Sequence, residues 1–207
     1  MVANGYVTLL IDSMGPRQVS TLCSGVRGGV NFFRGAADAH QAADHLRKLP
    51  YVDKARVGLV GFSWGAMVAA ASSSATWGAT LAKRERFAAA VAVYPGCFSI
   101  QPASGSSYEI VNNDIDRPLL VLMGAKDTET PPQECVQRLT LAKSNGAPVQ
   151  WHVYPDTTHC WDCKNLHNFS KVDFRGTSVV YRYDAMVTRD SEQRMLEFLG
   201  KSMTGKQ

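Results

Sequence analysis

The sequence has 207 residues, 45% of them hydrophobic and 19% charged, and its formal net charge at pH 7 is +4. These values are typical of a globular protein with a sizeable core and exclude an intrinsically disordered chain. The basic residues are scattered, so we expect neither nucleic acid nor a membrane among the partners.

No apolar run approaches the roughly 20 residues of a membrane span. Residues 1–207 are expected to form one domain, and the oligomeric state is left open. The five cysteines do not identify the compartment, and no signal peptide is visible at the N-terminus.

The first part of the chain contains a strand pattern, a loop and a helix pattern. Residues 5–12 are β-branched and aliphatic and lead into the turn signal Asp12-Ser-Met-Gly-Pro16, which predicts a buried parallel strand. Residues 16–30 are rich in Gly, Ser and Arg and predict a long irregular loop. Apolar and small residues with helical spacing then predict a helix over residues 31–49, with Asn31 as its N-cap.

Strand and helix patterns alternate along the rest of the chain. Such alternation, with strands that are apolar throughout, predicts an α/β fold in which a mostly parallel sheet carries helices on both faces. The expected strands are residues 56–61, 87–94, 118–123 and 149–154, and the expected helices are residues 64–75, 133–144 and 189–199. Residues 99–113 and 159–187 are expected to be irregular.

The motif Gly61-Phe-Ser-Trp-Gly65 lies between a predicted strand and a predicted helix. A G-x-S-x-G motif in this setting is typical of a nucleophile elbow, a sharp turn that lifts the serine above the sheet. Side chains at Gly61 or Gly65 are expected to collide with the neighbouring strand or helix. Ser63 is therefore the candidate nucleophile, and the amide of Trp64 is the candidate oxyanion-binding group.

A serine hydroxyl needs a general base, and the base needs an orienting carboxylate. His159 is the candidate base, because it lies in the loop just past the carboxyl end of the strand predicted at 149–154. His40 and His45 belong to the first predicted helix and are assigned packed or solvated roles, and His152 is assigned a structural role in a strand. The role of His167 is left open.

Asp127 is the candidate orienting carboxylate, four residues past the strand predicted at 118–123. The loops that follow parallel strands open into one crevice, so Ser63, Asp127 and His159 are expected to converge. Their order along the chain is that of the α/β-hydrolase fold. The weaker rivals are Asp12 and Asp156, and Glu129 is a neighbour or substitute.

These motifs resemble those of the dienelactone hydrolase family of α/β-hydrolases. The resemblance rests on Gly61-Phe-Ser-Trp-Gly65, the Asp127 turn and Tyr154-Pro-Asp-Thr-Thr-His159, and it covers roughly residues 4–200. It implies hydrolysis of small ester or lactone substrates through a covalent acyl-enzyme, without a metal or cofactor. The name-giving enzymes carry cysteine where this chain has Ser63, which shifts the expectation toward a general carboxylesterase.

The resemblance also implies substrate residues and a longer fold. Arg17 loosely matches an arginine that holds a substrate carboxylate in the family, and Tyr94 and Trp161 are candidate pocket linings with core packing as the alternative. Family members have further strands before the equivalent of residues 5–11, one of which leads into a second oxyanion-binding amide. We therefore expect an N-terminally truncated α/β-hydrolase, with a catalytically silent relative or fragment as the alternative function.

The sequence Cys160-Trp-Asp-Cys163 raises the question of a metal or redox site. Zinc needs about four ligands, and no second pair of cysteines is spaced to complete the set. A redox dithiol would lie at a helix N-terminus near the start of a βαβ unit, and this cysteine pair does not. We assign these cysteines to buried thiols or to disulfides with Cys97 or Cys135, and predict no metal.

Overall fold

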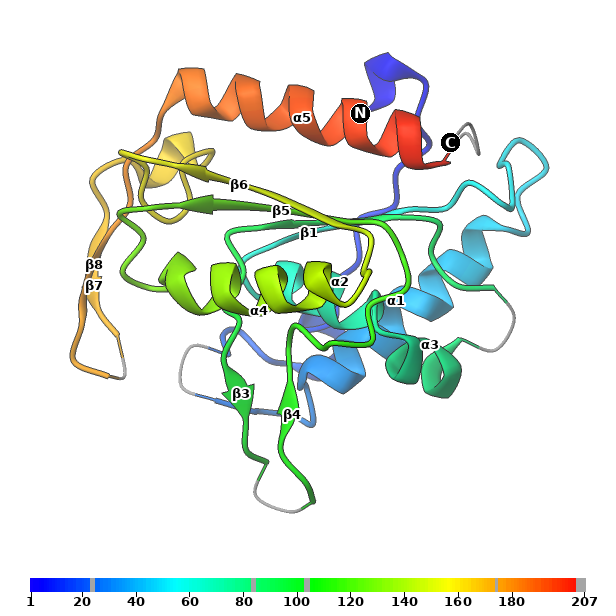
Figure 1. Cartoon of the computed structure of the whole chain (residues 1–207), viewed down its shortest axis with the longest axis horizontal. Coiled ribbons are helices and arrows are strands. Elements are labelled where there is room, and N and C mark those ends of the chain that lie inside the picture. Colours follow the sequence, from blue (N-terminus) through cyan, green and yellow to red (C-terminus); the bar gives the residue numbers. More distant parts are fainter. Residues whose placement is uncertain (23–24, 83–84, 103–104, 174, 204–207) are drawn as a thin grey trace.

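The centre of the fold is a four-stranded parallel sheet (Figure 1). The computed structural model describes residues 1–22, 25–82, 85–102, 105–173 and 175–203. The strand order is β1-β2-β5-β6, and each neighbouring pair is parallel. The strands are β1 (Leu59–Phe62), β2 (Ala90–Val93), β5 (Leu119–Gly124) and β6 (Val149–Tyr154). All four confirm predicted strands, although β1 and β2 are shorter than expected.

The helices confirm the alternating pattern. They are α1 (Phe32–Leu46), α2 (Trp64–Ser72), α3 (Ala75–Leu81), α4 (Pro132–Ser144) and α5 (Ala185–Met203). The Asn31 side chain accepts a hydrogen bond from the Arg34 amide at 2.8 Å, so the predicted N-cap of α1 is confirmed. The helix expected over residues 64–75 ends at Ser72, because Ser74 caps a separate helix through the Trp77 amide.

Short elements occupy segments predicted to be irregular. Two antiparallel hairpins pair β3 (Ser99–Ile100) with β4 (Tyr108–Glu109) and β7 (Ser170–Val172) with β8 (Ser178–Val180). Single 3-10 turns are η1 (Val2–Asn4), η2 (Gly15–Arg17) and η3 (Lys164–Leu166).

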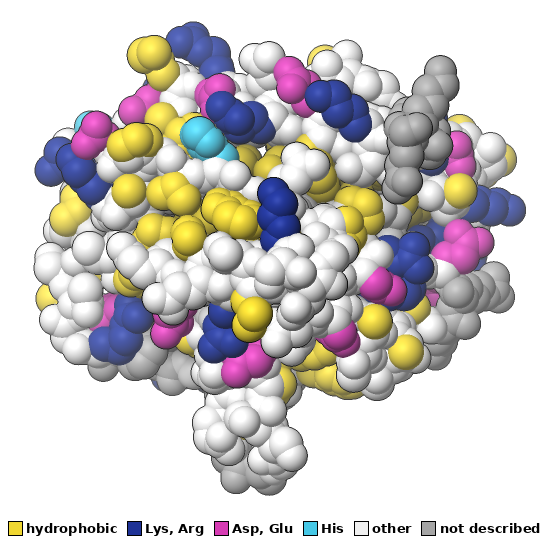
Figure 2. All heavy atoms as spheres, in the orientation of Figure 1, with side chains coloured by type: hydrophobic (Ala, Val, Ile, Leu, Met, Phe, Trp, Pro, Cys, Tyr) yellow, Lys and Arg dark blue, Asp and Glu magenta, His cyan; other side chains and the backbone are white. Residues whose placement is uncertain are grey.

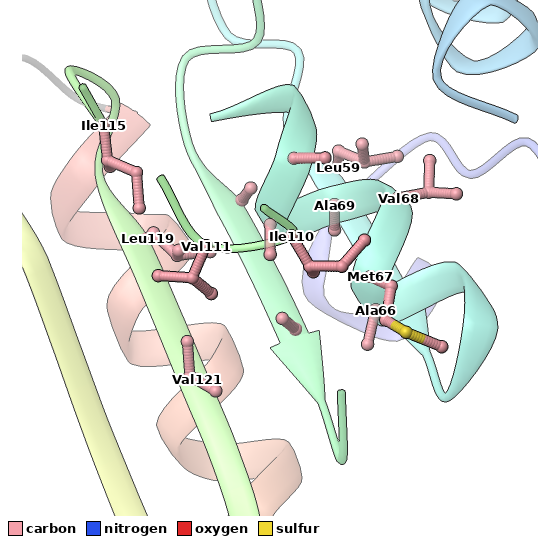
Figure 3. Close-up of a cluster of buried hydrophobic side chains, with 14 of the residues drawn as sticks. Leu59, Ala66, Met67, Val68, Ala69, Ile110, Val111, Ile115, Leu119 and Val121 are labelled. Atoms are coloured by element: carbon pink, nitrogen blue, oxygen red, sulfur yellow. The ribbon is translucent and has the colours of Figure 1, made fainter. Parts of the chain in front are cut away.

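Alternate residues of each strand face opposite sides of the sheet, and each side has its own core. On one side Leu119 and Val121 join the cluster that contains α1, α2 and α4. On the other side Leu120 and Leu122 pack with α5. Figure 3 shows Ile110 and Val111 among the side chains between β5 and α2. Helices therefore cover both faces, which confirms the predicted α/β class.

The surface is mixed in character. Figure 2 shows charged side chains scattered over the viewed face, with hydrophobic side chains gathered between α5 and α4, where the edge strand β6 lies. None of the described helices is both long enough and apolar enough to cross a membrane.

The strand predicted over residues 5–12 is wrong. This segment pairs with no strand among the described residues, and β1 lies at the end of the sheet. Leu9 is 44% exposed and Leu10 is 96% exposed, so the apolar run is not buried. An apolar pattern becomes a strand only where a neighbouring edge satisfies its backbone groups, and the segment does not lie against β1 in that way.

Candidate active site

Ser63 lies at the sharp turn between β1 and α2. Its φ of 50° and ψ of −115° are rare for a residue with a side chain, and such strained positions gather at functional sites. Its amide donates to the Val93 carbonyl at 3.0 Å, and its carbonyl accepts from the amides of Ala66 and Met67 at 2.9 and 3.1 Å. The predicted strand–turn–helix arrangement around Ser63 is confirmed.

The two motif glycines differ in what surrounds them. A Cβ at Gly61 would run into the backbone of Gly65 and Ala66, as expected for the tight turn. A Cβ at Gly65 would meet nothing within 4 Å among the described residues, so the collision expected there is wrong. Gly65 lies on a side of α2 with open space beside it, and only Gly61 is required by close packing.

His159 faces the serine from the loop after β6. Its Nε2 lies 3.0 Å from Ser63 Oγ, and its side chain is 2% exposed. The ring packs against Tyr94 and Tyr181, with centroids 4.6 and 5.5 Å apart. The Tyr94 hydroxyl in turn donates to Asp162 Oδ1 at 2.8 Å. Two aromatic contacts therefore hold the imidazole where it meets Ser63.

Asp127 contacts the other nitrogen of the same ring. Its Oδ2 lies 2.7 Å from His159 Nδ1. Its Oδ1 accepts from the amides of Glu129 and Thr130, both at 2.9 Å, and the Thr130 hydroxyl donates to Oδ2 at 2.8 Å. Hydrogen bonds within the turn after β5 thus fix the orientation of the Asp127 carboxylate toward the imidazole.

Thr130 is a site residue that sequence reasoning missed. Its hydroxyl lies 3.1 Å from His159 Nδ1 and 3.2 Å from the Tyr94 carbonyl oxygen, in addition to its contact with Asp127. A threonine three residues after an aspartate is a common turn element, and that local spacing was the available signal. The threonine therefore links the two side chains that orient the imidazole.

This geometry assigns the protons on the ring. An ionised carboxylate only accepts, so Nδ1 of His159 carries hydrogen toward Asp127 and Nε2 is free to accept from Ser63. The arrangement can remove a proton from the serine hydroxyl while the oxygen attacks an electrophile. Trp64 begins α2, where an amide has no intrahelical acceptor, so its N–H suits an oxyanion beside Ser63.

The three proposed substrate residues lie in different settings. Tyr94 is 3% exposed, and burial followed by the charge of Asp162 raises the pKa of its hydroxyl, so it stays a neutral donor. Trp161 is completely buried and donates to Ser191 Oγ at 3.2 Å, which favours the core-packing alternative. Arg17 forms a bidentate pair with Asp38, with both contacts at 2.9 Å.

Two of the other histidines and the two rival carboxylates have other contacts. The His152 ring packs against Tyr154 with centroids 4.5 Å apart, and His167 Nδ1 accepts from the Tyr183 amide at 3.1 Å. The Asp12 carboxylate accepts from the amides that follow it, and Asp156 pairs with Lys126 on the surface. None of these four side chains is hydrogen-bonded to Ser63 or His159 in the described part of the chain.

The cysteines form two disulfides, Cys97–Cys135 and Cys160–Cys163. The pairing expected of Cys160 and Cys163 with Cys97 or Cys135 is therefore wrong, because each of these two pairs is bonded within itself. Cys23 lies outside the described residues. Cys160, Asp162 and Cys163 place their ligand atoms within 4.8 Å of one another. Because the two sulfurs are bonded to each other, they are not thiolates that could hold a metal.

The parallel sheet, the serine elbow and the aspartate and histidine in loops after later strands define an α/β hydrolase. The profile of the dienelactone hydrolase family matches residues 25–203. The chain belongs to the dienelactone hydrolase family. This confirms the resemblance that the sequence motifs indicate.

Solved structures agree on the fold. An α/β hydrolase enzyme, MGS-M1, from a Medee basin deep-sea metagenome library has a TM-score of 0.62 and 17% identity over 87% of this chain and 69% of its own. A provisionally assigned dienelactone hydrolase from Klebsiella pneumoniae subsp. pneumoniae has a TM-score of 0.58 and 20% identity over 80% of this chain and 61% of its own. Esterase 2 of Thermogutta terrifontis, phosphorylated by paraoxon, has a TM-score of 0.59 and 16% identity over 83% of this chain and 65% of its own.

The chain therefore spans 61% to 69% of the length of these three proteins. No curated protein matches the chain in sequence.

Proposed function

We propose that the protein is a serine hydrolase that cleaves small carboxylic esters or lactones through an acyl-enzyme. The observation that carries the proposal is the hydrogen-bonded series from Ser63 Oγ through His159 to Asp127, at 3.0 and 2.7 Å. Membership of the dienelactone hydrolase family supports an ester-cleaving reaction. The esterase named among the similar structures agrees with that reaction class.

The reaction begins when His159 Nε2 takes the proton of Ser63. The serine oxygen bonds to the substrate carbonyl carbon, and the carbonyl electrons move to the oxygen, which the Trp64 amide stabilises. His159 then gives its proton to the leaving alkoxide, so the ester bond breaks and the acyl-enzyme forms. Water attacks the acyl group by the same route and releases the acid. Asp127 keeps Nδ1 protonated throughout.

The reaction uses groups of the chain and needs no cofactor. Ser63, His159 and Asp127 supply the nucleophile, the base and the orienting charge, so the proposed partner is a small ester or lactone. The Tyr94 ring packs against the imidazole with centroids 4.6 Å apart. We propose Arg17 as a substrate residue only for a ligand whose carboxylate can compete with Asp38 for its guanidinium.

The test is hydrolysis of p-nitrophenyl butyrate by the wild-type chain and two serine variants. Ser63→Ala is expected to reduce kcat by about 10³-fold or more, because the nucleophile is gone. Ser20→Ala, at an exposed position, is the matched control and should keep wild-type turnover. Equal turnover by Ser63→Ala would refute the proposal. A folded wild-type chain that hydrolyses no ester would favour the alternative of a catalytically silent relative or fragment.

A further inference from the structure

A second carboxylate approaches His159 from the side opposite Asp127. Glu129 Oε2 lies 3.9 Å from His159 Nε2, the nitrogen that also faces Ser63 Oγ at 3.0 Å. Asp127 is at the other nitrogen, 2.7 Å from Nδ1. Glu129 therefore does not substitute for Asp127. It faces the nitrogen on which a proton from the serine would arrive.

Two donors hold the Glu129 carboxylate in this position. The Tyr181 hydroxyl donates to Oε2 at 2.6 Å, and Lys171 Nζ donates to Oε1 at 2.7 Å. Burial and the bond to Glu129 raise the pKa of Tyr181 to about 12, so this phenol keeps its proton. Burial opposes the charge of Lys171, but the hydrogen bonds and charges of Glu129 and Tyr181 together outweigh burial and raise the pKa of Lys171. A donor on each oxygen therefore fixes the position of the Glu129 carboxylate.

The β7–β8 hairpin supplies both donors. Lys171 lies in β7, and Tyr181 directly follows β8. Figure 1 shows this hairpin beyond the carboxyl ends of β5 and β6. The Thr128 hydroxyl donates to the Ser178 carbonyl at 2.8 Å, and Arg175 Nη2 donates to the Glu129 carbonyl at 2.8 Å. These bonds hold the hairpin against the turn that carries Asp127 and Glu129. The position of Glu129 relative to His159 is therefore fixed by tertiary contacts.

We propose that Glu129 is a positioning residue that stabilises the protonated form of His159, and that Lys171 limits this effect by neutralising part of its charge. The proposal rests on the proposed function, because the proton comes from Ser63 when its oxygen bonds to the substrate carbonyl carbon. At that moment the imidazolium lies between the Asp127 and Glu129 carboxylates. Opposite charges about 4 Å apart favour the charged form of a titrating group.

Several titratable and charged side chains surround the His159 imidazole and can influence its protonation. The turn after β5 contributes Asp127 and Glu129, and the hairpin contributes Lys171 and Tyr181. Tyr94 lies after β2 with Asp162 behind its hydroxyl. Glu129 and Lys171 are the pair of opposite charge on the Nε2 side, and their side chains are 19% and 24% exposed. Each can therefore be replaced without opening the main core.

The experiment follows the His159 imidazole by NMR during a pH titration of the full chain. In Glu129→Gln the titration midpoint of the ring is expected to fall by roughly one pH unit, because a nearby negative charge is lost. In Lys171→Met it should rise by a smaller amount, since Glu129 is no longer neutralised. The double variant Glu129→Gln/Lys171→Met should keep a midpoint below that of the wild type and above that of Glu129→Gln, because the smaller effect of removing Lys171 offsets only part of the loss of Glu129.

A purely structural role for the contacts among Glu129, Lys171 and Tyr181 gives a different result. Both single variants would then loosen the hairpin and move the midpoint in the same direction, and the double variant would be no closer to wild type. That outcome, or midpoints that do not move, would overturn the proposal. Far-UV circular dichroism identifies a variant that fails to fold. If one single variant does not fold, the sign of the midpoint shift is taken from the other single variant and the double variant.

Activity separates this proposal from the proposed function. If the chain hydrolyses esters, the acidic limb of its kcat/KM profile should move to lower pH in Glu129→Gln and to higher pH in Lys171→Met. An active chain whose limb and NMR midpoint stay fixed would contradict only the role of Glu129. A chain with opposite NMR shifts but no ester hydrolysis would contradict only the proposed function.

Discussion

Asp127 Oδ2 lies 2.7 Å from His159 Nδ1, and the two side chains are 1% and 2% exposed. Water cannot replace either partner at this depth, so the contact fixes which ring nitrogen carries hydrogen. The bonds from Thr130 and the backbone leave Asp127 no freedom to turn away. The orientation of the imidazole toward Ser63 thus depends on this buried carboxylate.

Asp127→Asn should lower kcat for ester hydrolysis by about 10³- to 10⁴-fold with little change in fold. The amide can donate to Nδ1, which favours the wrong tautomer and leaves Nε2 protonated toward Ser63. Asp156→Asn is the control, because this rival carboxylate is 85% exposed and pairs with Lys126. Steady-state kinetics checks both. An Asp127→Asn variant within tenfold of wild type would contradict the assigned orientation role.

The two glycines of the elbow should respond in opposite ways to alanine. Gly61→Ala places a methyl group into the backbone of Gly65, so we expect a loss of several kcal/mol of unfolding free energy or no folded protein. Gly65→Ala meets no described atom within 4 Å and lies in α2, so it should stabilise the chain by up to about 1 kcal/mol. Urea unfolding measures both, and equal destabilisation would show that the elbow is packed differently.

Most of the sheet and the three central site residues follow from the sequence. Apolar runs such as Leu119–Gly124 predict buried parallel strands, and the position of Asp127 and His159 just past such strands predicts their convergence. The run at residues 5–12 has the same pattern but forms no strand, because it does not pair with β1 at the end of the sheet or with any other described strand.

The surroundings of the imidazole could not be predicted in this way. Lys171 and Tyr181 come from a hairpin whose strands are only three residues long and partly polar, too short for a periodic signal. Their meeting with Glu129 is set by tertiary contacts between segments about 40 to 50 residues apart in sequence. Local propensity contains no information about such contacts.

The two disulfides should contribute unequally to stability. Cys97 and Cys135 are 38 positions apart, whereas Cys160 and Cys163 are 3 apart. Loop-closure entropy of the unfolded chain predicts a loss of about 4 kcal/mol for Cys97→Ala/Cys135→Ala and about 2 kcal/mol for Cys160→Ala/Cys163→Ala. Urea unfolding without reductant gives both values. A larger loss from the shorter loop would mean that native contacts near His159, not chain entropy, dominate.

His40 should make stability depend on pH. Its two ring nitrogens have no hydrogen-bond partner in the described residues, and burial followed by the charges of Arg86 and Arg47 lowers its pKa from 6.5 to about 4. The unfolded chain binds the extra proton between these values, so this contribution, about 3 kcal/mol at most, is lost as pH falls from 6.5 to 4.

His40→Leu should reduce that pH dependence, whereas His45→Asn on the exposed side of the same helix should not. Urea unfolding at pH 7.5 and pH 4.5 provides the comparison. If the His40 variant loses as much stability on acidification as the wild-type chain, the buried neutral imidazole is not the cause.

The central claim is that Ser63 is a nucleophile activated by His159, and covalent labelling tests it most directly. The chain is treated with a fluorophosphonate, and the adduct is located by mass spectrometry of its peptides. We expect one adduct, on Ser63, that is absent in Ser63→Ala and forms at least about 10²-fold more slowly in His159→Gln. A folded chain that takes up no label, or labels elsewhere at the same rate in Ser63→Ala, would contradict the account.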